Sequence, residues 1–306
     1  MADRDEDSQP TSVADDGAGR TTSALDRVLG VEADELDEHG IAKRFGISWE
    51  PPMPLMVAVG SYVGATFGVA IIYSIVVTSL QLTQGPSGAG GVIGQVTGQL
   101  ATGQSPEVTV GTIDLTLAMR ALLQFFLWAP LAIPAIVVAR RKGAGVKADL
   151  GLELRARDVG VGAVIGVACQ LLVPLLYVAL RPFIGTPDVS AEARELTDQA
   201  TDVVGIGLLL IITVVFAPLV EEIYYRGLVL RAAERSYGAT IALLGSSLFF
   251  AVTHFQVLQF PALLLFGIVL GAIALRTGRI GIPITAHIAF NLTAVVLLLA
   301  FPDSPF

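Results

Sequence analysis

Two adjacent glutamates and an arginine lie in a stretch of the chain that is otherwise apolar. The sequence PLVEEIYYR, which ends at Arg226, closes an apolar run that begins near Val203. A charge at membrane depth costs roughly 2.5–3.5 kcal/mol on insertion scales, so such a charge is usually paired or functional. On a helix, Glu222 and Arg226 are i,i+4 neighbours that can neutralise each other, whereas Glu221 points about 100° away. The spacing therefore predicts one paired carboxylate, Glu222, and one that is available for chemistry, Glu221.

Two of the three histidines also lie inside apolar segments, His254 at the end of FAVTH and His287 at the start of HIAFN. A carboxylate and an imidazole can together activate a water molecule, and N–H donors can stabilise the oxyanion that forms next. His287 and Asn291 are i,i+4 on one predicted helix, so they present two donors side by side. Phe250 is one turn before His254 and is expected to pack over it.

The same residues also allow less specific hypotheses. Glu222 with Arg226 can be an ion pair that only holds helices together, and His287 with Asn291 can be a polar cross-link between helices. A bis-histidine haem on His254 and His287 is a second class of function. Ion-coupled transport through Glu221 is a third. A non-catalytic membrane binding or immunity protein also remains open.

The sequence lacks the motifs of two common protease classes. It has neither the GxSxG of serine hydrolases nor the HExxH of zincins. Two histidines and a glutamate could still hold zinc with an open fourth position. We expect no metal cofactor, because His287 is paired with the carboxamide of Asn291 rather than with a second metal ligand, and zinc is the alternative.

The composition is that of a membrane protein. The chain has 306 residues, of which 53% are hydrophobic, and its mean hydropathy is +0.70. Apolar segments long enough to cross a ~30 Å hydrocarbon core lie at 54–80, 115–139, 159–180, 205–230, 239–258, 260–275 and 283–301. We therefore predict an all-α, polytopic transmembrane helix bundle with about seven spanning helices, or eight if part of 81–112 re-enters.

Charge predicts the orientation of this bundle. Lys and Arg occur in the segments 40–53, 140–158, 231–238 and 276–280, whereas the alternate loops 81–112 and 255–260 have none. Because basic loops stay in the cytosol, the N-terminus is expected inside the cell and the C-terminus outside. Of the 27 acidic residues, 12 lie in the first 40, so the net charge of −8 belongs mainly to the tail and argues against nucleic acid as a partner. Residues 1–53 are expected to form an acidic, disordered or interfacial cytosolic tail.

Three short motifs together resemble those of the CPBP family of intramembrane proteases. They are the glutamate pair with Arg226, the aromatic residue four positions before His254, and Asn291 four positions after His287. That family includes the type II CAAX prenyl endopeptidases and bacterial homologues linked to bacteriocin processing and immunity. The resemblance covers about 115–301. It implies a membrane-embedded protease domain at 54–306. Our leading hypothesis is a helical bundle whose polar cavity opens toward the cytosol.

The resemblance also implies roles for six residues. Glu221 matches the family's catalytic glutamate, and His254 helps it to polarise the attacking water. Glu222 and Arg226 match the other fixed positions of the first motif, and His287 with Asn291 matches the oxyanion-stabilising pair. The implied partners are membrane lipid and a peptide or protein substrate. Only the family resemblance suggests that this substrate is prenylated. No oligomeric state is predicted.

Overall fold

A computed structural model describes residues 22–84, 116–185 and 188–301. In these residues the regular structure is helical apart from one isolated bridge between Leu36 and Ala42, so the predicted all-α class is confirmed. The α-helices are α1 (Ala24–Leu29), α2 (Met53–Gln84), α4 (Leu117–Arg141), α5 (Val146–Asp149), α6 (Ala156–Ile184), α7 (Ala191–Asp198), α8 (Val203–Leu209), α9 (Ala217–Glu222), α10 (Leu230–Tyr237), α11 (Ala239–Val252), α12 (Phe260–Thr277) and α13 (Gly281–Ala300). A 3-10 turn, η1 (Ala33–Glu35), and two π-helical stretches, η2 (Leu210–Phe216) and η3 (Ile223–Val229), complete the list.

Six helices of the described residues are long and apolar enough to span a membrane, and the chain is a multi-pass membrane protein. They are Met53–Ser79, Leu117–Arg141, Ala156–Ile184, Val203–Tyr237, Phe260–Thr277 and Gly281–Ala300. The segment predicted to span at 239–258 is α11, which has only 14 residues. At 1.5 Å per residue α11 is about 21 Å long, too short to cross the hydrocarbon core alone. Most of 81–112 lies outside the described residues.

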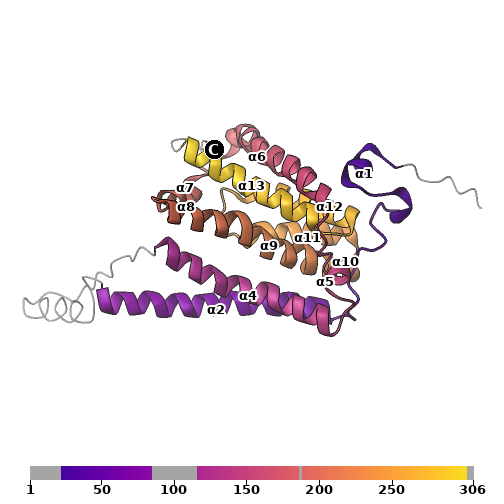
Figure 1. The fold of residues 1–306 in the computed structure, drawn as a ribbon, viewed down its shortest axis with the longest axis horizontal. Helices are drawn as coiled ribbons and strands as arrows, with labels where there is room; N and C mark the ends of the chain where they lie inside the picture. The colour runs from indigo at the N-terminus through magenta and orange to yellow at the C-terminus, as the bar shows by residue number, and fades with distance from the viewer. Residues whose placement is uncertain (1–21, 85–115, 186–187, 302–306) are drawn as a thin grey trace, which may run out of the picture.

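The long helices run side by side around one continuous rod. Elements α8, η2, α9, η3 and α10 follow one another as a single span, 203–237. Helices α2 and α4 pack against each other on one side of this rod, and α6 packs along α13 on the other (Figure 1). Helices α11 and α12 form a further antiparallel pair. Glu221 and Glu222 lie on this rod and are therefore placed in the middle of the bundle.

Small residues bring α13 close to α6. A Cβ added at Gly162 would collide with the Thr285 side chain, and one at Gly166 with the carbonyl of Ala286. The Thr285 hydroxyl donates to the carbonyl of Asp158 at 2.7 Å. Glycines four residues apart allow such close contact between membrane helices. This contact fixes α13 immediately before His287.

The segment 22–52 packs against one end of the bundle rather than lying free. Arg157 Nη2 donates to the carbonyls of Arg27 and Val28, and Arg276 pairs with Asp26. Leu29, Val31 and Leu36 are buried in a cluster with side chains of α12 and α13. This part of the predicted tail is therefore ordered. Basic side chains donate hydrogen bonds to its carbonyls, and its few apolar residues are buried against the helices. Residues 1–21 lie outside the described part of the chain.

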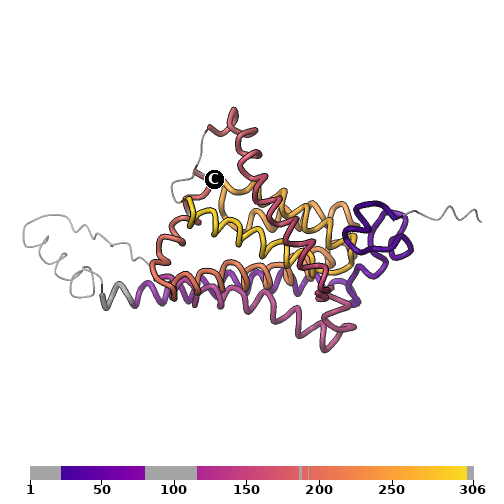
Figure 2. The backbone as a smooth tube through the Cα atoms, turned by 45° about the horizontal axis from the view of Figure 1, so that its top comes forward, coloured from indigo at the N-terminus to yellow at the C-terminus, as the bar shows by residue number. Residues whose placement is uncertain are grey.

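The basic segments gather at this same end, which we call the arginine end. Arg44 donates to the carbonyl of Thr277, and Arg231 donates to the carbonyls of Gly46 and Gly278. Figure 2 shows the N-terminal segment in indigo at this end of the bundle, whereas the last turns of α13, in yellow, reach the other end. The two ends of the molecule therefore differ: the arginine end is rich in basic residues and is covered by the N-terminal segment 22–52.

Candidate active site

Three of the predicted residues converge from three separate elements. Glu221 on α9 has its Oε2 atom 3.8 Å from Nε2 of His254 and 4.0 Å from Nε2 of His287. His254 follows α11, and His287 lies in α13. The Glu221 side chain is 17% exposed and the His287 side chain 6%. Neither gap is a direct hydrogen bond, and each leaves space for a small molecule to contact both partners.

Glu222 holds His287 in place. Because it is already bonded to Arg226 and His287, it is not available as a free base beside Glu221. Its Oε1 atom accepts from Arg226 Nη1 at 2.8 Å and from His287 Nδ1 at 2.9 Å, and all three side chains are buried. The predicted Glu222–Arg226 ion pair is therefore present. Because an ionised carboxylate only accepts, Nδ1 of His287 carries hydrogen and Nε2 is the atom turned to Glu221.

His254 is fixed by its own backbone neighbourhood. Helix α11 ends at Val252, so His254 lies in the following turn and not inside the helix expected over 239–258. Its Nδ1 atom lies 2.6 Å from the carbonyl of Phe250. Since that carbonyl can only accept, Nδ1 is the donor, and Nε2 again faces Glu221. Phe255 follows with φ of +56°, a strained value for a residue with a Cβ, and such strain clusters at functional sites.

The Phe250 ring contacts both imidazoles and also the guanidinium of Arg226. The Phe250 ring meets His254 edge to face at 4.6 Å between centroids, as predicted, and His287 at 5.9 Å. The guanidinium of Arg226 lies over the same ring at 4.4 Å. Phe266 contacts His287 from the other side at 5.3 Å. These contacts fix both ring planes without using an Nε2 atom.

The helix that carries the glutamates has π-helical stretches on both sides of them. In η2 the N–H of Ala217 donates to the carbonyl of Ile212, five residues back. The next donor in this register would be residue 218, which is proline and has no N–H. The carbonyl of Thr213 is therefore left without its backbone donor in this turn. Stretches of this kind are frequent at functional sites.

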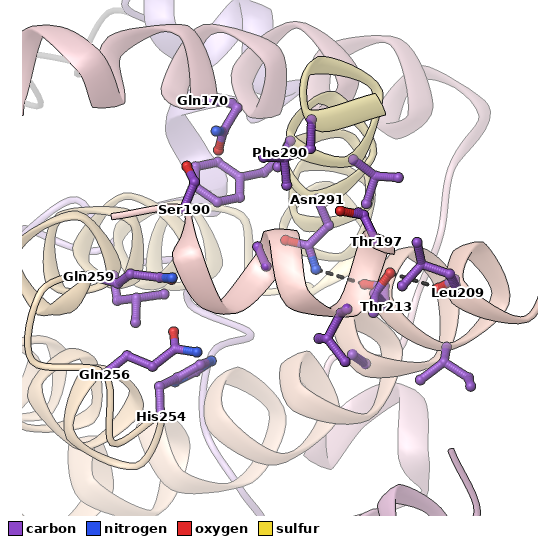
Figure 3. Close-up of a pocket in the computed structure, with 18 of the residues that line it drawn as sticks. Gln170, Ser190, Thr197, Leu209, Thr213, His254, Gln256, Gln259, Phe290 and Asn291 are labelled. Atoms are coloured by element: carbon purple, nitrogen blue, oxygen red, sulfur yellow. Dashed lines mark hydrogen bonds between the residues drawn. The ribbon is translucent and has the colours of Figure 1, made fainter. Parts of the chain in front are cut away.

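Asn291 supplies the missing donor. Its Nδ2 atom donates to the carbonyl of Thr213 at 2.8 Å, drawn as a dashed line in Figure 3. A buried carbonyl without a partner is costly, so this bond supports the turn that leads to Glu221. The sequence predicts Asn291 as a free donor beside His287. One of its two amide hydrogens is instead committed to the backbone.

Two further residues position the site and were not identified from the sequence. The hydroxyl of Tyr225 lies 2.6 Å from that of Thr253, which in turn bonds to the carbonyl of Phe250 at 3.0 Å. These bonds tie the end of α11 to η3. The signals were present, because Tyr225 lies inside the motif PLVEEIYYR and Thr253 precedes His254.

A cavity of about 430 Å³ begins at these residues. Glu221, His254 and His287 line its inner part, and apolar side chains of α4, η2 and α13 line most of the rest. Neutral carboxamides interrupt the apolar lining, among them Gln170 on α6 and Gln256 in the turn after His254 (Figure 3). Its size is that of ordinary ligand sites.

The donor set has the chemistry that zinc sites use, since two imidazole nitrogens and one carboxylate face one another. Among the described residues, however, no group of three or more His, Cys, Asp or Glu side chains is arranged to hold a metal ion. We therefore derive no step through a metal.

Residues 204–293 match the family model Rce1-like, described as "Type II CAAX prenyl endopeptidase Rce1-like". This range contains all six predicted site residues. The predicted resemblance to the CPBP family is thereby confirmed for this segment, which is similar to the type II CAAX prenyl endopeptidase family. No curated protein and no solved structure matches the chain.

Proposed function

We propose that the protein is an intramembrane endopeptidase that hydrolyses a peptide bond at or near the membrane. The observation that carries this proposal is the position of Glu221 Oε2, about equally far from the two imidazole Nε2 atoms, 3.8 and 4.0 Å, at the inner part of the cavity. A carboxylate that no arginine or lysine neutralises, with two oriented imidazoles beside it, is a combination that general acid and base catalysis uses.

In this mechanism one water molecule bonds to Glu221 and to Nε2 of His254. Glu221 takes a proton from the water, and the water oxygen attacks the carbonyl carbon of the peptide. When the tetrahedral intermediate collapses, the C–N bond breaks and Glu221 returns the proton to the leaving amine. His254 directs a lone pair at the water, because its Nδ1 hydrogen is held by the Phe250 carbonyl. No metal is required in this scheme, and zinc remains the alternative to be tested.

His287 is the proposed donor to the oxyanion, together with the second amide hydrogen of Asn291. Because Nδ1 of His287 already donates to Glu222, Nε2 can donate only when the ring is an imidazolium. The Glu222 carboxylate, which also accepts from Arg226, stabilises such a cation. Charge-assisted donors of this kind typically contribute about 10²–10³ in rate.

The substrate is a peptide or protein reached from lipid. Prenylation of that substrate is proposed from the family description alone, because this chain offers no separate observation for it. A multi-pass position in the cell membrane, with the N-terminus in the cytosol, is part of the same proposal and rests on the basic loops.

A comparison of membrane proteomes tests the proposed activity. Cells carrying the wild-type protein should contain peptide termini that are absent from cells carrying Glu221→Gln, because the amide keeps the size of the side chain but cannot accept the proton. Glu50→Gln is the matched control, since Glu50 is 85% exposed and far from the site in the N-terminal segment. Identical termini in all three strains would refute proteolysis by Glu221.

A further inference from the structure

Some of the carboxamides that line the cavity have no hydrogen-bond partner among the described residues. They are Gln124, Gln170 and Gln256. Gln259 and Asn291 line the same cavity, but each donates to a backbone carbonyl, at 3.0 and 2.8 Å. Carboxamides that only hold helices together make bonds of this second kind. Helix packing therefore does not account for the free carboxamides.

The free carboxamides lie where such groups are costly. Gln124 is in the span Leu117–Arg141, and Gln170 is in the span Ala156–Ile184. A polar group without a partner is unfavourable in apolar surroundings, and polar residues at membrane depth are usually functional. Gln256 lies in the turn after α11, and Figure 3 shows it and Gln170 among the side chains of the cavity. Free donors and acceptors from separate elements around one space indicate a polar ligand there.

A peptide main chain matches these groups. Each carboxamide has an oxygen acceptor and N–H donors, so it can bond to both the N–H and the C=O of one peptide group. The rest of the lining is largely apolar and includes Ile212, Leu263 and Phe290. Main-chain groups that enter such a cavity need partners, because unbonded peptide groups in apolar surroundings are costly. The free carboxamides can supply those partners.

The cavity offers little to a charged ligand. Outside the cluster of Glu221, His254 and His287, the charged side chain in its described lining is that of Arg120. Arg120 Nη2 pairs with Glu195 Oε1 at 2.9 Å, so its charge is compensated. A neutral, apolar stretch of polypeptide therefore fits the lining better than a charged one.

The turn that carries Gln256 is held at both ends. The hydroxyl of Tyr177 on α6 donates to the carbonyl of Leu258 at 2.5 Å. Before Gln256 in the chain, His254 is fixed by its bond to the carbonyl of Phe250. The turn therefore presents Gln256 close to His254 in a set position, and less free energy is needed to order it when a ligand binds.

We propose that Gln124, Gln170 and Gln256 bind the main chain of the substrate. Through these bonds the cavity recognises the backbone of a neutral, apolar segment and accepts different side chains along its walls. This inference rests on the proposed function for the class of the substrate. The glutamines bind and position that substrate, and Glu221 remains the group that acts on the bond to be cut.

A binding assay with a pair of synthetic peptides tests this recognition. The probe is a short, capped peptide of alternating leucine and alanine that carries a fluorophore. Its partner has lactic acid in place of each alanine, so an ester oxygen replaces the main-chain N–H and the apolar side chains stay the same. Both are titrated with full-length Glu221→Gln in detergent, so that no cleavage occurs. Fluorescence anisotropy should show saturable binding of the peptide, about 10-fold tighter than that of the ester.

Substitutions in the same background identify the groups that bind the main chain. Gln124→Met, Gln170→Met and Gln256→Met should each weaken binding of the peptide by about 3–10-fold and binding of the ester by less. Methionine keeps the length of the side chain but cannot replace these bonds. Gln199→Met is the matched control, because Gln199 ends α7 and is not part of the cavity lining. If thermal unfolding shows that one variant does not fold, the other two decide the test.

The inference and the proposed function fail in different ways. No saturable binding of the peptide, equal binding of peptide and ester, or equal weakening by Gln199→Met would overturn the inference. If the expected pattern is found but the wild-type protein cleaves no peptide, main-chain recognition stands and the proposed proteolysis fails. If the wild-type protein cleaves its substrate but the pattern is absent, the proteolysis stands and the assigned role of the glutamines fails.

Discussion

Two glutamates that are neighbours in sequence have different surroundings at the residue scale. Glu222 is fully buried and accepts from both Arg226 and His287, whereas Glu221 makes neither bond and faces the cavity. The difference follows from the roughly 100° that separates consecutive residues on a helix. Glu222 therefore orients His287, and Glu221 is the carboxylate that we propose as the base.

The histidines test the choice between metal-free and zinc-dependent water activation. We expect His254→Ala and His287→Ala each to lose about 10²-fold or more in rate, because one loses the partner of the water and the other an oxyanion donor. Purified active wild type should carry no stoichiometric metal. His39→Ala, which removes a histidine that is 74% exposed, is the matched control. One zinc per chain, lost in both site variants and needed to restore activity after chelation, would refute the metal-free scheme.

Asn291 is expected to donate one hydrogen bond to the backbone carbonyl of Thr213 and another to the oxyanion. Substitution of Pro218 can distinguish these two roles. Asn291→Ala should destabilise the protein by about 1–3 kcal/mol, because the Thr213 carbonyl loses its donor. In a Pro218→Ala background the new N–H of residue 218 can bond to that carbonyl, so the same change should cost less in thermal unfolding. The rate loss should persist, because the second amide hydrogen is still absent.

A double-mutant cycle on stability and on rate distinguishes the outcomes. An equal loss of stability in both backgrounds would contradict the role assigned to the Thr213 carbonyl. Recovery of the full rate in Pro218→Ala/Asn291→Ala would show that Asn291 acts through the backbone alone and does not contact the oxyanion.

The elements that position the site are only partly visible in the sequence. The pairing of Glu222 with Arg226 and the contact of Phe250 with His254 are local, so i,i+4 spacing predicts them. The bond from Asn291 to Thr213 is not, because it depends on a π-helical register that the sequence does not indicate. Nor does hydropathy predict where α11 ends, since the apolar residues continue past His254 as exposed side chains such as Val257.

The contact between α6 and α13 predicts that alanine destabilises the protein at one glycine of α6 and stabilises it at another. Gly166→Ala places a methyl group against the carbonyl of Ala286, next to His287, and should cost about 1–3 kcal/mol and reduce activity. Gly160→Ala, six residues earlier on the same helix, meets nothing within 4 Å and should stabilise the helix by about 0.5–1 kcal/mol. Thermal unfolding in detergent measures both. Equal effects would contradict the close contact between the helices.

The two ends of the whole molecule are built from different interactions. At the arginine end, the basic residues that predict orientation also hold the segment 22–52 in place, which composition alone assigns to a disordered tail. Low hydrophobicity predicts disorder only when a segment has no surface to bind. Here Leu29 and Val31 find such a surface on the helices.

The attachment of this segment should depend on acidity. The hydrogen bond from Arg276 holds the pKa of the Asp26 carboxyl well below its usual value. A lowered pKa stabilises the fold above the unfolded value, near 3.9, and that contribution is lost as pH falls through the folded value. The difference in melting temperature between wild type and Asp26→Asn should therefore be constant from pH 7 to about pH 5 and shrink below about pH 4. A difference that grows on acidification would contradict this assignment.

The central claim is that Glu221 drives hydrolysis of a peptide bond by water. The most direct measurement uses purified protein in liposomes of defined lipid, a substrate segment found by the proteome comparison, and water enriched in oxygen-18. Mass spectrometry should find one heavy oxygen in the new C-terminal carboxylate with the wild type and with Glu50→Gln, and no product with Glu221→Gln. The same product at a comparable rate with Glu221→Gln, or a product without the heavy oxygen, would contradict the account.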